Sequence, residues 1–173
     1  SQMKVDDDGN CTIAINKGGR PGLTQIDNLG SINWSIGSSF NFGSYKSVAI
    51  DSSGNIFTGG YAPNSTVYPY IFKFNKSGTL VGQTRATNQY HGTSSSQTIL
   101  DLDVNPNDDK LHGIFQFYAS GGWHTCMFKC DNDLTNFTYY NWDYGTDVTY
   151  PDRVSYGVDD DGDRYLTIYK PVG

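Results

Sequence analysis

A double-hairpin pattern that returns along the chain limits most strongly how this sequence can fold. Its clearest copy occupies residues 47–61 and 70–81, where apolar and polar residues alternate on both sides of short turns. Gly54 and Gly78 end these turns. Glycine suits this place because it adopts a positive φ at little steric cost. Each half of the copy therefore predicts a β-hairpin.

The same plan recurs upstream and downstream of this copy. The upstream version covers 3–14 and 23–34, and its turn glycines precede those of the clearest copy by 45 and 48 residues. A looser version covers 100–115 and 125–137, and here we expect Asp and Asn to replace the turn glycine, since both tolerate a left-handed backbone. A fourth version begins at 154–168 and is incomplete.

Units of this length with four short strands have the size of propeller blades. We therefore predict one all-β domain over 1–173, a β-propeller with about three and a half four-stranded antiparallel blades of a larger ring. A β-sandwich also has many short strands, but it does not predict a hairpin pair that returns in phase. The blade-like units are expected at about 3–36, 46–86, 98–142 and, incomplete, 153–173.

The segments 48–61 and 70–80 resemble the bacterial β-propeller repeat called SBBP. The resemblance implies a blade, and it implies no activity, because that repeat is defined by strands and turns. Similar blades are expected in secreted bacterial proteins and in tail or surface proteins of tailed phages. Three and a half blades do not close a ring, so the expected partners include the remaining blades of the protein or other subunits.

The composition argues against two classes of partner. The chain carries a net charge of -6 with only 12 basic residues, which are scattered, whereas nucleic acids and anionic membranes attract clustered Lys and Arg. No stretch approaches the roughly 20 apolar residues of a membrane-spanning helix. We therefore expect no nucleic-acid binding and no membrane insertion, and we expect a place on a virion surface or outside the cell.

Acidic turns raise the question of a bound metal. Asp159, Asp161 and Asp163 alternate as in calcium-binding loops, but no acidic residue follows at the distance that would close the coordination sphere. The turn at 51–54 has the same place in its unit without the extra acids, so a plain hairpin turn explains the pattern as well. No other cofactor is predicted.

Aromatic residues gather between 121 and 150. Those that we select as candidate ligand-binding residues are Trp123, His124, Tyr140, Trp142 and Tyr144. Aromatic side chains with polar tips suit contacts with glycans and proteins. The alternative is that they pack between blades, as aromatic residues on strands commonly do.

No pattern identifies a catalytic residue. Histidines and carboxylates can be paired in several ways, but no nucleophile has the expected strand-turn-helix context. The sequence therefore favours a non-enzymatic structural or binding module that recognises a glycan, a receptor or a neighbouring subunit. The alternative is an extracellular carbohydrate-active enzyme with a propeller catalytic domain.

Overall fold

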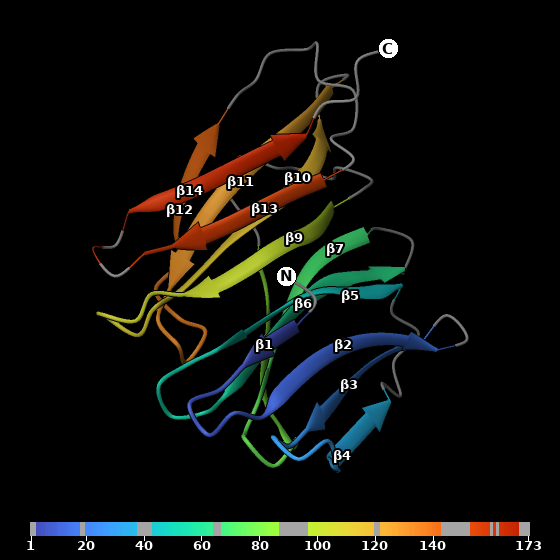
Figure 1. Cartoon of the computed structure of the whole chain (residues 1–173). Coiled ribbons are helices and arrows are strands. Elements are labelled where there is room, and N and C mark those ends of the chain that lie inside the picture. Colours follow the sequence, from blue (N-terminus) through green and yellow to red (C-terminus); the bar gives the residue numbers. More distant parts are fainter. Residues whose placement is uncertain are drawn as a thin grey trace.

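All regular structure in the described part of the chain is β-strand (Figure 1). The computed structural model describes residues 3–17, 20–37, 43–63, 67–86, 97–119, 122–142, 153–159, 161 and 163–169. Within these ranges the strands form antiparallel sheets in chain order, as the sequence predicts. Among the same residues, no helix is long and apolar enough to cross a membrane.

Each sheet is a meander, in which strands consecutive in the chain are hydrogen-bonded neighbours. The first sheet contains β1 (Met3–Val5), β2 (Cys11–Lys17), β3 (Arg20–Ile26) and β4 (Ile32–Gly37). The second contains β5 (Ser44–Ile50), β6 (Ile56–Pro63), β7 (Val67–Phe74) and β8 (Leu80–Arg85). The third contains β9 (Gln97–Val104), β10 (Leu111–Ala119), β11 (Gly122–Cys130) and β12 (Thr138–Trp142). The fourth contains β13 (Arg153–Val158) and β14 (Arg164–Tyr169).

A turn that begins with Asp or Asn closes most of these hairpins. In the turn between β5 and β6, Asp51 Oδ1 accepts hydrogen bonds from the backbone N–H groups of Ser53 (3.0 Å) and Asn55 (2.8 Å). Gly54 has a φ of +77° and donates its N–H to the carbonyl of Asp51 (2.9 Å). This is a three-residue hairpin loop held by its leading side chain. The same two side-chain bonds recur at Asp6, Asp27, Asn75 and Asp159.

The third sheet departs from the predicted turn chemistry at one position. Asp109 takes the positive φ (53°) in the turn between β9 and β10, as expected for Asp. Between β11 and β12, however, Leu134 has a φ of 67° and donates its N–H to the carbonyl of Asp131 (2.9 Å). Leu134 therefore occupies the position at which Asp or Asn was expected, whereas Asn136 in the same turn has a positive φ (53°), as expected for Asn. Burial of the Leu134 side chain in the apolar cluster next to it offsets the backbone cost of about 1–2 kcal/mol.

Neighbouring sheets pack face to face, and the first strand of each sheet contacts the sheet before it. Between the first two sheets, Leu23 lies in one apolar cluster with Val48, Ile56 and Phe72, and all four are at most 1% exposed. Trp34 lies at the edge of this cluster and donates its Nε1–H to the carbonyl of Lys76 (3.1 Å). The core of the protein therefore lies between sheets.

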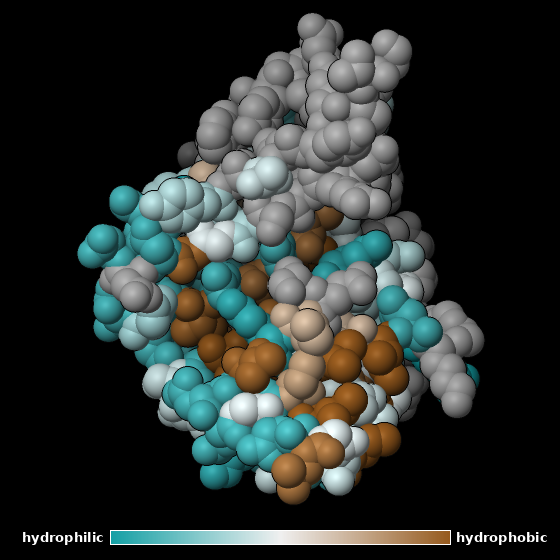
Figure 2. Space-filling view, viewed as in Figure 1, coloured by the Kyte–Doolittle hydropathy of each residue, from teal (hydrophilic) through white to brown (hydrophobic). Residues whose placement is uncertain are grey.

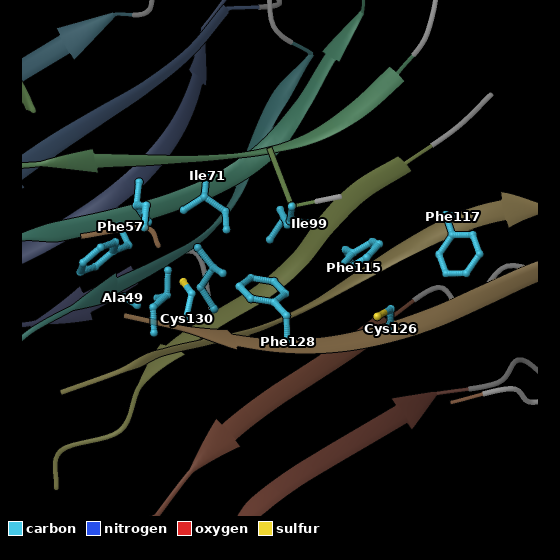
Figure 3. Close-up of a cluster of buried hydrophobic side chains, with 13 residues drawn as sticks. Ala49, Phe57, Ile71, Ile99, Phe115, Phe117, Cys126, Phe128 and Cys130 are labelled. Atoms are coloured by element: carbon cyan, nitrogen blue, oxygen red, sulfur yellow. The ribbon is translucent and has the colours of Figure 1, made fainter. Parts of the chain in front are cut away.

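A larger apolar cluster joins the second and third sheets (Figure 3). Phe57 and Ile71 of the second sheet lie in this cluster with Ile99, Leu111 and Phe128 of the third sheet. Each of these side chains is at most 1% exposed. A Cβ at Gly59 would collide with Ile99, so the two sheets approach closely at that point. The second sheet is thus covered on both faces.

Loss of the Phe57 ring should be among the most damaging changes to this core. We expect Phe57→Ala to lower the free energy of unfolding by about 3–5 kcal/mol, because it removes a fully buried ring and leaves a cavity. Chemical denaturation measures this value. Leu29→Ala is the control, since Leu29 is 87% exposed and its loss should change stability by less than about 0.5 kcal/mol. Equal effects of the two variants would contradict this view of the core.

Candidate functional site

The hairpin turns that begin with Asp or Asn lie at one end of the molecule, which we call the turn end (Figure 1). Its turns are those at 6–10, 27–31, 51–55, 75–79, 105–110, 131–137 and 159–163. All 18 acidic residues of the chain are aspartates, and most of them belong to these turns. The turn end therefore carries most of the negative charge of the protein.

A groove of about 560 Å³ opens at the turn end, where the turns of three sheets meet. Val5, Ile50 and Val104 contribute an apolar part of its lining. Each of the three is the last residue of the first strand in its sheet, namely β1, β5 and β9. The groove therefore follows from the way in which the first strands of the sheets converge.

Polar turn residues form the remainder of the lining. They are Asp6, Asp7, Asp8, Asn10, Asp51, Ser52, Ser53, Lys76 and Asp109, together with Gly54 and Pro106 of the turns and Gln25 of β3. Asp7 and Asp8 are exposed, as are Ser52 and Ser53, so their polar atoms face solvent beside the apolar lining. The groove thus combines hydrogen-bond acceptors and donors with an apolar surface.

The carboxylates beneath these exposed residues are fixed by hydrogen bonds. Asp6 Oδ1 accepts from the N–H of Asn10 at 2.7 Å, and Asp6 Oδ2 accepts from the Asn10 side-chain amide at 2.9 Å. Asp51, only 5% exposed, makes the same pair of bonds to Asn55 at 2.8 Å each. The backbone around the groove is therefore held in one conformation by local bonds.

Bonds between turns of the second and third sheets add to this rigidity. Asp109 Oδ1 accepts from the N–H of Ser52 at 2.9 Å, and Asp109 Oδ2 accepts from the Asn132 side-chain amide at 2.8 Å. Lys73 Nζ donates to the carbonyl of Asn132 at 2.7 Å and lies 3.9 Å from Asp51 Oδ2. Asp51 is therefore part of both a turn and a link between sheets.

Removing Asp51 should cost more than removing a carboxylate that holds only its own turn. We expect Asp27→Ala to lower the free energy of unfolding by about 1 kcal/mol, as for the loss of a capping side chain. Asp51→Ala should lower it by at least about 2 kcal/mol, because the partly buried donors of Asn55 lose their acceptor and the Lys73 ammonium loses its neighbouring carboxylate. Urea denaturation compares the two. A smaller loss for Asp51→Ala would show that the link between sheets contributes little.

The structure places two of the predicted ligand-binding residues, His124 and Tyr140, outside the lining of the groove and on different faces of the third sheet. His124 pairs with Phe117 in the strand register, and their rings stack at 5.2 Å on the side that packs against the second sheet. Tyr140 pairs with Met127, which puts it on the opposite face, where the Arg164 guanidinium lies 4.5 Å from its ring. The side chains of Trp123 and Trp142, and residue Tyr144, lie outside the described residues. Ligand binding by this set stays a prediction.

The predicted calcium residues lie in the turn between β13 and β14. Asp159 Oδ1 accepts from the N–H groups of Asp161 (3.1 Å) and Asp163 (2.8 Å), and Asp159 Oδ2 accepts from the Tyr165 hydroxyl (2.8 Å). Asp27 makes the same backbone bonds in a turn without neighbouring acids. The hairpin therefore explains Asp159 by itself, and calcium binding at these residues stays a prediction.

A buried polar contact between the third and fourth sheets was not expected from the sequence. Nδ1 of His112, on β10, lies 3.2 Å from the hydroxyl of Tyr156, on β13. His112 is 2% exposed, and Asp101, also 2% exposed, accepts the backbone N–H of Tyr156 at 3.0 Å. Asp103 accepts the N–H of Val158 at 3.3 Å and forms an ion pair with Lys4 of β1 at 2.8 Å. The sequence does contain one signal for this contact, because Asp101 and Asp103 alternate with apolar residues, which indicates a strand with one polar face.

Burial determines the protonation of this contact. It lowers the pKa of His112 to about 4, with a further lowering by the positive charge of Arg164, and nearby Asp108 and Asp103 oppose the shift. Burial also raises the pKa of Tyr156 to about 12. Both side chains are therefore neutral where they meet near neutral pH.

This shift predicts a loss of stability in mild acid. Unfolded His112 takes up a proton near its ordinary pKa of 6.5, whereas the folded residue does so only near 4. The free energy of unfolding should therefore be constant above about pH 6.5 and fall as the pH decreases toward 4, by at most about 1.4 kcal/mol per pH unit from this residue. Denaturation curves across this range measure the slope. His112→Gln should flatten it, and an unchanged slope in that variant would assign the effect to other groups.

Comparison with known proteins supports the fold. No protein-family model matches the chain, and no curated protein matches it. The structure of TolB from Acinetobacter baumannii matches with a TM-score of 0.53 and 15% sequence identity, over 95% of this chain and 36% of the TolB chain. The GH43 endo-arabinanase from Bacillus licheniformis matches with a TM-score of 0.46 and 13% identity, over 96% of this chain and 70% of that one.

The chain has a β-propeller fold, as predicted, and the matched TolB structure is a β-propeller. The chain spans 36% of the length of the TolB chain. At this sequence identity the likeness concerns the fold alone, because one fold serves many functions. Membership of the SBBP type of repeat stays a prediction.

Proposed function

We propose that this chain is a non-enzymatic binding module of a virion-surface or secreted protein, and that the groove at the turn end receives part of a glycan. The observation that carries the proposal is the groove itself, in which an apolar surface of Val5, Ile50 and Val104 adjoins exposed acceptors. The module would belong to a larger protein that contains further blades or other subunits.

A sugar ring matches both halves of this lining. Its hydroxyl groups donate hydrogen bonds, which the carboxylates of Asp7 and Asp8 and the hydroxyls of Ser52 and Ser53 accept. Its C–H faces are apolar and fit against Val5 and Ile50. Binding sites for small molecules use placed polar groups beside apolar surface to fix the orientation of the ligand.

The rigidity of the turns supports binding at this end. The leading side chains of the turns at 6–10 and 51–55 hold their backbones, and Asp109 ties the second of them to the third sheet. A binding surface that is already ordered loses little conformational entropy when a ligand arrives. The polar, weakly charged composition and the resemblance to secreted repeats support an extracellular place.

An array of oligosaccharides tests the proposal, followed by titration of the best ligand against two matched variants. Asp8→Ala removes an exposed acceptor of the groove, and we expect affinity to fall about tenfold, a loss of about 1.4 kcal/mol. Asp161→Ala removes the residue at the same position of an equivalent turn that does not line the groove, so affinity should not change. Asp161 is exposed, as Asp8 is, so both variants should fold.

Two outcomes would contradict the proposal. An equal effect of the two substitutions, or no binding anywhere on the array, would remove the groove as a glycan site. Release of reducing ends from a bound oligosaccharide would favour the alternative of a carbohydrate-active enzyme over a module that only binds.

A further inference from the structure

One face of the first sheet is apolar and is not covered by the described part of the chain. Strand register places Met3, Val5, Cys11, Ile13, Ile26 and Ile32 together on the face opposite to the second sheet, and we call this set the open face. Val5 is 58% exposed and Met3 52%. In Figure 2, brown atoms extend across the region that β1 and β2 occupy in Figure 1.

The equivalent face is covered in the next two sheets. Aligned on the leading residue of the turn, Met3 corresponds to Val48 and to Leu102, which are 0% and 1% exposed. Cys11 pairs with the last residue of the first strand, as do Ile56 and Leu111 in the next two sheets, and both of these are fully buried. In each of those sheets the preceding sheet provides the cover. The open face therefore has the chemistry of a sheet-packing surface that lacks its neighbour among the described residues.

The other end of the row of sheets presents the complementary feature. Phe57 of the second sheet packs onto the third, and it pairs across its hairpin with Ala49. The same alignment places Tyr165 of β14 at the position of Phe57, and Tyr165 pairs with Gly157. Tyr165 is 58% exposed, whereas Phe57 is fully buried. An aromatic ring beside a small residue thus lies on the outer face of the fourth sheet.

We propose that two copies of this chain associate head to tail, with the Tyr165 face of one copy packed on the open face of the next. The contact would repeat between copies the packing that Phe57 makes on Leu102 and Leu111 within the chain. None of the six residues of the open face carries a charge, so an aromatic ring covers them without desolvating an ion. The open face shares Val5 with the lining of the groove, but the inference does not depend on the proposed function, because its test measures association and not glycan binding.

The two surfaces differ from each other, so the contact is heterologous and each copy retains one free surface after pairing. Association of this kind proceeds beyond the dimer as concentration rises, until the copies close a ring. A symmetric contact, in which both copies use the same face, would stop at the dimer.

Sedimentation velocity over a wide concentration series tests the proposal on the whole chain. We expect the weight-average sedimentation coefficient to rise with concentration. Val5→Lys combined with Met3→Lys should weaken association by at least about tenfold, because charges would enter the contact. Leu29→Lys is the matched control, since Leu29 is apolar and 87% exposed but lies in a turn outside the open face, and it should associate like the unaltered chain.

Mixing two defective variants tests the head-to-tail geometry. Tyr165→Ala removes one surface and leaves the open face intact, whereas the Met3→Lys and Val5→Lys variant removes the other. Each alone should remain monomeric, and an equimolar mixture should form dimers and nothing larger, because only one complementary pair of surfaces remains. Circular dichroism of each variant confirms that it is folded.

Three results would overturn the inference. They are a monomer at every concentration of the unaltered chain, an equal loss of association in Leu29→Lys, and a mixture of the two variants that fails to form dimers although both are folded.

Discussion

The packing of one sheet against the next is the constraint on which the remainder of the structure depends. In the second sheet, Val48 and Phe72 face the first sheet, while Phe57 and Ile71 face the third, and all four are at most 1% exposed. A sheet that is apolar on both faces is not stable in water by itself, so its hairpins acquire stability from neighbours rather than from their own hydrogen bonds. Cooperative folding therefore requires several sheets, and the local turns set only the order in which strands pair.

The same packing of sheets also forms the groove. Because the first strand of each sheet contacts the sheet before it, β1, β5 and β9 converge, and their last residues come together although they are far apart in the chain. The ion pair of Lys4 with Asp103 crosses from β1 to β9 at 2.8 Å and connects the first and third sheets. The groove is thus a property of the arrangement of sheets, with the turns supplying its polar groups.

The hairpins could be predicted from the sequence because the signal for them is local. An Asp or Asn followed three residues later by glycine specifies a turn through bonds within five residues, as at Asp51 and Asn75. The positive φ of Leu134 could not be predicted, because its cost is offset by burial of the side chain, and that burial depends on packing against the second sheet. The groove and the contact of His112 with Tyr156 could not be predicted for the same reason, since distances between sheets depend on packing that no short segment encodes. The separation of His124 and Tyr140 follows from the register of β11 and β12, which depends on the geometry of the turn between these two strands.

The design of the turns also affects how such a protein could change over time. In the turns that contain glycine, the first residue provides the bonds that hold the turn and the glycine provides the unusual backbone, so the side chains of the two residues between them contribute little to the fold. Those two positions are Asp7 and Asp8 in one turn, Ser52 and Ser53 in another, and Asn28 and Leu29 in a third, all of them exposed on the same backbone. Substitutions there alter the chemistry that the protein presents to its surroundings at almost no cost in stability, which makes this end of the molecule a surface on which new specificities can evolve.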